Sequence, residues 1–219
     1  MNRMTLNTAF SVRSTLTGGL MIAGLVLLIW GIYIPLKGAL AQILLEAAWE
    51  QAQKPHPLMS AKNGTGEKML IHPWPGADMY PIGKLELTSA RSSWIVVGGA
   101  TPRNLAFAPV WSEQSVRPGA SGVAIISGHK DTQFAALEHV QSGDRLRWTT
   151  ERGEHIDFVV RETAVINATE TQLTLDAAGP ARLLLVTCFP FDSSYGGPLR
   201  YVVLADAVHT SPIVRVALE

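Results

Sequence analysis

The sequence is poor in cysteine and in charge, and each shortage excludes a class of protein. A single cysteine, Cys188, among 219 residues excludes an intrachain disulfide framework. Only 16% of residues are charged, and the 18 basic residues balance the 18 acidic ones, so no polybasic surface indicates nucleic acid binding. Acidic residues such as Asp157, Glu162 and Glu170 are scattered rather than grouped as in a calcium loop. We therefore predict no metal ion, no cofactor and no nucleic acid partner.

Apolar residues are abundant, at 47% of the chain, and they concentrate near the N-terminus. Residues 16–34 carry no charge, and 19 helical residues at about 1.5 Å each span most of a hydrocarbon core about 30 Å thick. Arg3 and Arg13 precede this run, whereas Lys37 stands alone after it. By the positive-inside rule we predict a transmembrane helix at 16–34, with residues 1–15 in the cytoplasm and the rest of the chain outside.

A cleavable signal peptide is the alternative interpretation of this run. The run is longer than an ordinary signal-peptide core, and Ala39-Leu40-Ala41 is the one weak cleavage candidate, so we favour an uncleaved anchor. Residues 35–80 then form a juxtamembrane segment. Its first part, 36–53, has apolar residues at helical spacing and predicts an amphipathic helix that lies on the bilayer, docks on the following domain or acts as a plain spacer. Its second part, 54–80, is rich in proline, which predicts a linker.

Beyond residue 81 the pattern is that of an all-β domain. Short runs rich in β-forming residues recur between turn signals such as Gly98-Gly99 and Pro118-Gly119, which indicates a barrel or sandwich. Apolar residues at helical spacing predict one short helix at 132–140. The predicted strands are residues 82–87, 93–97, 122–127, 145–150, 155–167, 182–188 and 200–207.

Three residues that carry chemistry lie at ends of these predicted strands. Cys188 ends one buried run and Arg200 begins the next, so an antiparallel hairpin would place them side by side. His129 follows the strand at 122–127. A thiol with a pKa of about 8.5 needs a base or a cationic neighbour to react at neutral pH, and histidine and arginine supply both. The alternative is that Cys188 is a packed small hydrophobe and His129 a solvated loop residue.

Together these motifs resemble a known family. Leu184-Leu185-Val186-Thr187-Cys188, Gly128-His129 and the downstream Arg200 look like the sortases, the membrane-anchored cysteine transpeptidases of bacteria. The resemblance covers residues 81–207, although Leu184 stands where the family commonly has threonine, and the juxtamembrane region resembles that of sortases from Gram-negative bacteria. It implies a closed β-barrel of about eight strands with short helices at 81–219. It also implies a catalytic set of His129, Cys188 and Arg200.

The resemblance further implies the reaction. The expected substrate is a protein with a C-terminal LPXTG-like sorting signal, which is cleaved between Thr and Gly through a thioester and joined to an amine acceptor. As weaker candidates for peptide contact we name Thr187, Phe189, Pro190 and Tyr195. The expected location is the inner membrane, as a single-pass protein with a periplasmic catalytic domain. An unpaired cysteine in that oxidising space favours a functional thiol.

Two other classes of function stay open at this point. An extracytoplasmic cysteine peptidase or hydrolase would use the same thiol and imidazole but release its product to water. A non-catalytic, membrane-anchored β-domain would merely pack Cys188 and His129. Transfer of the peptide to an added amine separates the first class from a sortase, and a thiol-reactive probe tests the second.

Overall fold

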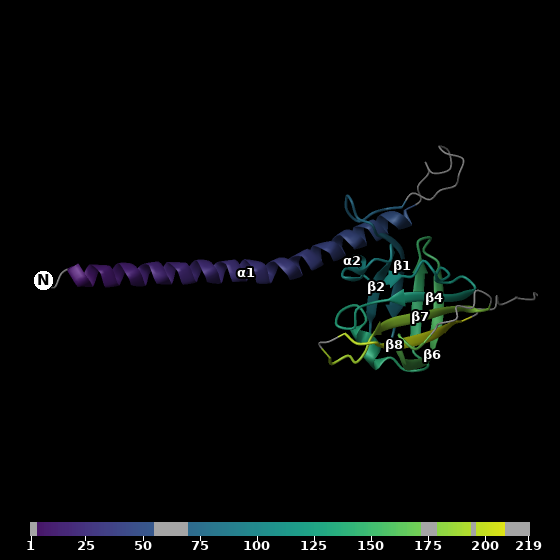
Figure 1. Ribbon diagram of the computed structural model, residues 1–219. Helices are drawn as coiled ribbons and strands as arrows, with labels where there is room; N and C mark the ends of the chain where they lie inside the picture. The colour runs from purple at the N-terminus through teal and green to yellow at the C-terminus, as the bar shows by residue number, and fades with distance from the viewer. Residues whose placement is uncertain (1–3, 55–69, 172–178, 194–195, 209–219) are drawn as a thin grey trace, which may run out of the picture. The chain divides into compact units, whose positions relative to one another are not determined.

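A computed structural model describes residues 4–54, 70–171, 179–193 and 196–208. The chain divides into two compact units, Met1–Ile43 and Leu44–Glu219. Helix α1, Met4–Gln53, contains most of the first unit and continues into the second (Figure 1). The domain boundaries predicted from the sequence stay predictions.

The first unit presents an apolar helix surface. Large side chains such as Leu20, Met21, Leu27 and Trp30 are each more than two thirds exposed. Among the side chains that the structure describes, no helical stretch is both long and apolar enough to span a membrane.

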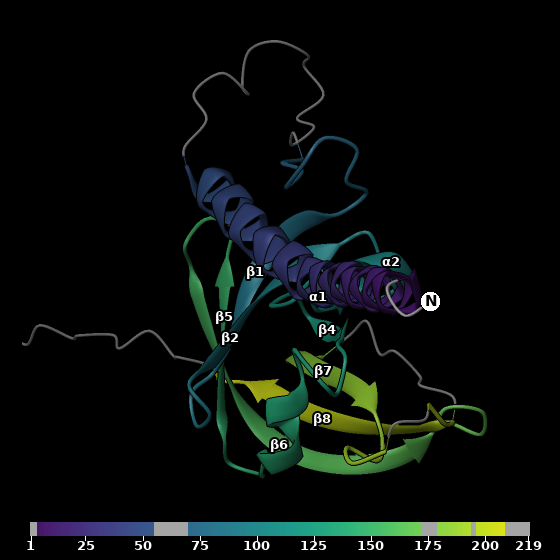
Figure 2. The same cartoon turned by 90° about the vertical axis from the view of Figure 1, so that its left-hand side faces the viewer.

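The second unit is built on a closed β-barrel. Within the described residues eight strands follow the order β1-β2-β3-β4-β7-β8-β6-β5, and pairing of β5 with β1 closes the barrel (Figures 1 and 2). Pairs β2·β3 and β4·β7 are parallel, and the others are antiparallel. The strands are β1 Tyr80–Leu87, β2 Ser92–Gly98, β3 Val110–Trp111, β4 Gly122–Ser127, β5 Arg145–Thr150, β6 His155–Asn167, β7 Ala181–Cys188 and β8 Leu199–Ala207. Two short helices interrupt them, α2 Pro102–Leu105 and the 3₁₀ helix η1 Ala135–His139.

Large apolar side chains fill the barrel interior. Trp148 is 2% exposed and Phe158 is fully buried, and a fully buried side chain of this kind stabilises the fold by about 1.5–3 kcal/mol. Gly83 of β1 makes room for the Trp148 ring, because a Cβ atom at Gly83 would lie 2.0 Å from it. Strand β7 has buried residues on both faces at Leu183, Leu184 and Leu185, as its continuous apolar run predicts.

A second apolar cluster lies on the outer face of β2 and β3. Ile95 and Val97 belong to it, whereas Val96 between them belongs to the barrel interior, as the alternation of a strand requires. Leu45 and Trp49 from the last turns of α1 pack on this face, at 1% and 4% exposure. Of the three roles left open for the helix at 36–53, its last turns therefore dock on the barrel.

The barrel of about eight strands is confirmed, and most predicted strand bounds are within two residues of the observed ones. Strand β3, Val110–Trp111, was not among the predicted strands, because two residues carry no periodicity. The helix predicted at 132–140 is the shorter 3₁₀ helix Ala135–His139.

Candidate functional site

Parallel pairing of β4 with β7 brings His129 and Cys188 to the same edge of the barrel. The register runs from Gly122 opposite Ala181 to Ser127 opposite Val186. His129 lies two residues beyond Ser127, and Cys188 lies two residues beyond Val186. Since parallel strands advance together, His129 and Cys188 follow neighbouring strands at the same level.

Two hydrogen bonds continue this ladder between the strand ends. The Gly128 N–H donates to the Val186 carbonyl at 3.1 Å, and the Thr187 hydroxyl donates to the Gly128 carbonyl at 2.8 Å. Thr187 is 2% exposed, so this bond lies in the interior. These bonds explain the dipeptides Gly128-His129 and Thr187-Cys188. In each pair the first residue bonds to the neighbouring strand and thereby fixes the backbone position of the second.

The His129 turn is held on the side away from β7 as well. Its carbonyl accepts from the Phe134 N–H at 2.9 Å, and its own N–H donates to Gln133 Oε1 at 3.1 Å. The Gln133 amide also donates to the Leu105 carbonyl at 3.4 Å, which links the turn to the end of α2. Gly128 must be small, because a Cβ atom there would lie 2.7 Å from the Phe134 ring.

Strands β7 and β8 place Arg200 directly opposite Cys188. The two residues are partners in the antiparallel register, as the expected hairpin requires. The Arg200 guanidinium donates through Nη1 to the carbonyls of Gly197 at 2.6 Å and Leu199 at 2.8 Å. The Phe189 N–H donates to the Leu199 carbonyl at 3.1 Å, which extends the pairing of β7 with β8 by one bond. The backbone of Arg200 is therefore next to that of Cys188. Its guanidinium binds carbonyls of the residues that lead into β8.

All three side chains are accessible to a substrate. Cys188 is a free thiol of intermediate exposure, Arg200 is half-buried, and His129 is exposed. An imidazole and a free thiol at one solvent-accessible edge, with a guanidinium on the next strand, form a set that can carry out nucleophilic acyl transfer.

The residues expected to contact the peptide fall into three groups. Phe189 and Pro190 are half-buried at the start of the loop, where Phe189 stacks on Tyr201 with ring centroids 6.4 Å apart. Thr187 as a peptide contact stays a prediction; its side chain is buried, and its hydroxyl donates to the Gly128 carbonyl. Tyr195 lies outside the described residues.

Comparison with known proteins identifies the family. A model of the sortase domain matches residues 85–208, more than half of the chain. The chain belongs to the sortase family. Sortases are cysteine transpeptidases, and this chain is one. Sortase D of Bacillus subtilis strain 168 is 27% identical over 167 residues, which cover 75% of this chain and 82% of that protein.

Solved sortase structures share the fold. A Sortase D5 transpeptidase of Clostridium perfringens aligns with a TM-score of 0.60 at 19% identity, over 78% of this chain and 99% of that one. Sortase A of Corynebacterium diphtheriae aligns with a TM-score of 0.55 at 21% identity, over 80% of this chain and 87% of that one. At these sequence identities the structural similarity shows that the fold is shared, and it does not identify the substrate.

A cavity of about 320 Å³ lies beside the end of β4 that leads to His129. Its lining includes Ser127, two residues before His129, together with Thr101, Leu105 and Ser112. In the wall formed by α2, the Thr101 hydroxyl caps the helix by accepting from the Asn104 N–H at 3.3 Å. Most of the lining of this cavity comes from the stretch of chain that runs through α2 and β3, between residues 100 and 112.

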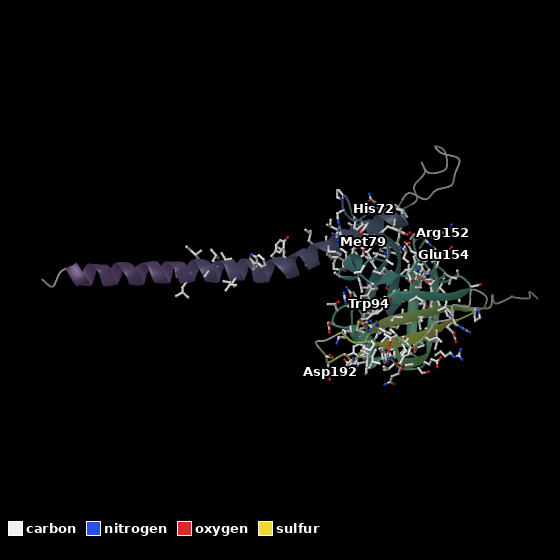
Figure 3. All side chains as sticks on the ribbon, viewed as in Figure 1. His72, Met79, Trp94, Arg152, Glu154 and Asp192 are labelled. Atoms are coloured by element: carbon white, nitrogen blue, oxygen red, sulfur yellow. The ribbon has the colours of Figure 1, made fainter. Side chains whose placement is uncertain are left out.

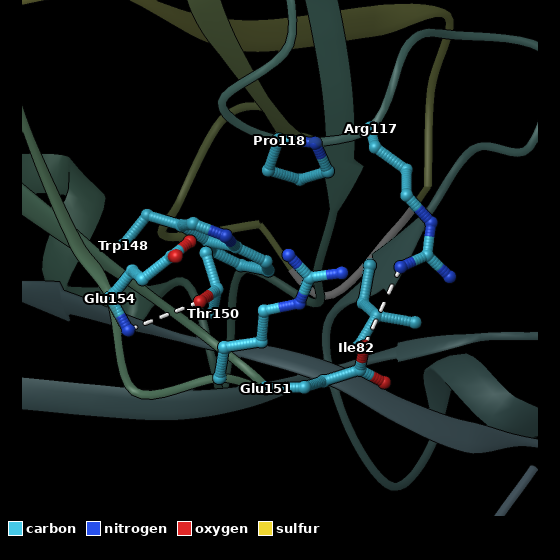
Figure 4. Close-up of a pocket in the computed structure, with 8 residues that line it drawn as sticks. Ile82, Arg117, Pro118, Trp148, Thr150, Glu151 and Glu154 are labelled. Carbon is cyan, nitrogen blue, oxygen red and sulfur yellow. Dashed lines mark hydrogen bonds and ion pairs between the residues drawn. The ribbon is translucent and has the colours of Figure 1, made fainter. Parts of the chain in front are cut away.

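A second cavity, of about 280 Å³, lies in a different part of the barrel (Figure 4). It is lined by Trp148, Arg117 and Glu151, and the last two form an ion pair at 3.6 Å. Arg152 and Glu154 of this region lie far from Asp192 of the β7–β8 loop (Figure 3). Neither Cys188 nor His129 is among the residues that line the second cavity.

Gln133 and Lys130 are the site residues that the sequence analysis missed. The roles of both depend on backbone carbonyls that are remote in sequence, Leu105 for Gln133 and Pro190 for Lys130. No local sequence pattern indicates such partners. The only signal in the sequence is that both residues lie within four positions of His129.

Proposed function

We propose that Cys188, His129 and Arg200 are the catalytic residues of a two-step acyl transfer. The Cys188 thiolate attacks the scissile carbonyl carbon, the C–N bond breaks, and the His129 imidazolium gives its proton to the departing amine. The acyl group remains on sulfur as a thioester. An amine then transfers a proton to His129 and attacks the thioester, which forms a new amide and releases the thiolate.

One observation carries this proposal. The parallel register of β4 and β7, extended by the Thr187–Gly128 hydrogen bond, sets His129 level with the chain's only cysteine at an accessible edge. A buried structural cysteine would need none of these features. A transfer enzyme needs each of them, because the proton donor and the nucleophile act on the two ends of one bond.

Arg200 has two candidate roles in this reaction. Its guanidinium either binds the peptide or stabilises the oxyanion that forms on thiol attack. The bonds from Nη1 to the carbonyls of Gly197 and Leu199 favour the first role, because they aim the head group along the loop. Loss of an oxyanion donor costs about a hundredfold in kcat, whereas loss of a peptide contact raises KM, so a kinetic split of an Arg200→Lys variant distinguishes the two roles.

The substrate that fits best is an LPXTG-like sorting signal cleaved between Thr and Gly, as the family resemblance implies. The cavity lined by Ser127 and α2 lies near the end of β4 that leads to His129, and it offers space for side chains that precede the scissile bond. Phe189 and Pro190, which directly follow Cys188, are half-buried and available for further contacts. The acceptor is an amine of unassigned identity.

We also propose that residues 16–34 anchor the enzyme in the inner membrane, with the catalytic barrel in the periplasm. Support comes from the 19-residue run without charge, from Arg3 and Arg13 before it, and from the exposed apolar side chains of this helix. A C-terminal tag should resist protease in intact cells and become sensitive once the outer membrane is opened. A tag that is degraded only after cell lysis contradicts this topology.

Mass spectrometry of the peptide products tests the catalytic proposal. The full chain in detergent is incubated with a quenched LPXTG-type peptide and a small amine, beside the variants Cys188→Ala, His129→Ala and Arg200→Ala. We expect a peptide–amine amide from the wild type and its loss in all three variants. Hydrolysed peptide alone would indicate a cysteine peptidase. No turnover, together with a Cys188 that resists alkylation in the folded protein, would indicate a non-catalytic domain.

A further inference from the structure

Lys130, the residue directly after His129, is buried although it carries a charge. Lysine is almost never fully buried unless it is paired, yet Lys130 is 7% exposed. Its ammonium donates to the Pro190 carbonyl at 2.6 Å and also to the Ser193 carbonyl. Both acceptors lie in the loop that leaves Cys188, 60 or more residues further along the chain.

Two converging carbonyls explain why a lysine is tolerated here. An ammonium removed from water is costly unless its N–H groups find acceptors, and a compact ammonium with three donors accommodates carbonyls from different directions. Carbonyls three residues apart meet at one nitrogen only if the chain curves around it. An apolar side chain at residue 130 would leave both carbonyls without this donor, so the curve of the loop depends on Lys130.

The loop is held by cations at both of its ends. Arg200 binds the carbonyls of Gly197 and Leu199 at the β8 end, and Lys130 binds those of Pro190 and Ser193 at the β7 end. The Arg200 contacts are local in sequence. The Lys130 contacts instead join two separate strand ends, the one that carries His129 and the one that carries Cys188.

We propose that Lys130 is a positioning residue that fastens the β7–β8 loop to the His129 turn. Its ammonium keeps residues 189–193 in place beside the thiol, so that the nucleophile and the peptide that contacts Phe189 and Pro190 stay aligned with His129. This role rests on the proposed acyl transfer for its kinetic consequence. The hydrogen bonds by which the Lys130 ammonium holds the loop do not depend on that reaction.

Hydrogen exchange and kinetics of the full chain in detergent test this role. Lys130→Met removes the charge and the donors at similar length, Lys130→Arg keeps donors for two carbonyls, and Lys84→Met is the matched control in β1, where Lys84 forms an ion pair with Glu46 outside the site. In Lys130→Met we expect about tenfold faster amide exchange in residues 189–193. We also expect kcat for peptide–amine transfer to fall about 10- to 100-fold, by more than KM rises, because small misplacements of reacting groups are costly.

Rescue separates positioning from a general loss of stability. Lys130→Arg should recover loop protection and most of kcat, and Lys84→Met should match the wild type in both. Wild-type exchange in Lys130→Met, or faster exchange with unchanged kcat, would overturn the proposal. If the Met variant does not fold, Lys130→Gln takes its place, and wild-type loop protection and kcat in that variant would equally refute the role. A wild type without transfer activity would refute the proposed function instead, whereas the exchange result would still decide whether Lys130 holds the loop.

Discussion

The hydroxyl of Thr187 offers a sharp test of how the catalytic edge is built. Thr187→Val keeps the shape and β-branching of the side chain and removes only the hydrogen bond to the Gly128 carbonyl, 2.8 Å long and buried. Leaving a buried acceptor without its donor costs about 1–3 kcal/mol of folding free energy. For a folded unit of this size, each 1 kcal/mol lowers the unfolding midpoint by about 2–4 °C.

The substitution should lower activity as well as stability. Gly128 precedes His129 and Thr187 precedes Cys188, so the lost bond loosens the two reacting groups relative to each other. We expect kcat/KM for peptide–amine transfer to fall about tenfold or more, measured at a temperature at which the variant stays folded. Thr187→Ser keeps the hydroxyl and should retain most of the activity.

Thr149→Val is the matched control for this substitution. Thr149 is also a buried strand threonine, 8% exposed, and its hydroxyl shares a hydrogen bond with His155 Nδ1 at 3.0 Å, in β5 and β6 rather than at the catalytic edge. We expect a stability loss no larger than that of Thr187→Val and an unchanged kcat/KM. Equal activity of Thr187→Val and wild type, or equal losses in both variants, would refute the positioning role of Thr187.

Three further predictions concern stability. Gly128→Ala forces a Cβ atom to within 2.7 Å of the Phe134 ring and should cost about 1–3 kcal/mol, with a matching loss of activity, as measured by thermal unfolding and peptide turnover. Trp49→Ala removes the largest side chain of the cluster outside the barrel and should lower the free energy of unfolding in denaturant by about 3–5 kcal/mol. A smaller loss would mean that the helix is not docked. The Arg147 hydrogen bond lowers the pKa of Asp157, so Asp157→Asn should lose at most about 1 kcal/mol above pH 4, because both side chains are over 40% exposed. That difference should vanish as the pH falls through the lowered pKa, and a difference that grows in acid would contradict the assignment.

Most strands of the barrel could be predicted from the sequence, because strong turn signals bound them. The strands at Gly122–Ser127, Arg145–Thr150 and His155–Asn167 begin and end where the sequence predicted. Each has a glycine at or near at least one end, and strand-forming residues that follow such a turn signal leave little choice. The two-residue strand Val110–Trp111 follows a proline and has no room for an alternating pattern.

The helix after His129 shows where local pattern fails. Apolar spacing predicted a helix from residue 132, but η1 begins at Ala135. The side chains of Thr132 and Gln133 explain the delay, because the Thr132 hydroxyl donates to Gln133 Oε1, which also accepts from the His129 N–H. Polar side chains that bind the backbone nearby compete with a helical turn, and the partner here is the histidine turn itself.

The residues proposed for catalysis could be selected from the sequence, but the contacts that hold them could not. His129, Cys188 and Arg200 stand at strand ends, and their motifs resemble those of the family. Lys130 and Gln133 act through carbonyls remote in sequence, which only the fold brings near. The parallel register of β4 and β7 likewise joins segments about 60 residues apart, so the alignment of imidazole with thiol is a property of the barrel.

Intact-protein mass spectrometry of the full chain tests the central claim most directly. The chain is mixed with an LPXTG-type peptide without an amine acceptor and is quenched in acid within seconds. The account predicts an adduct with the mass of the acyl portion up to Thr, which is localised to Cys188, removed by hydroxylamine and absent from Cys188→Ala. Peptide turnover that persists in Cys188→Ala, or an adduct on any other residue, would contradict acyl transfer through this thiol.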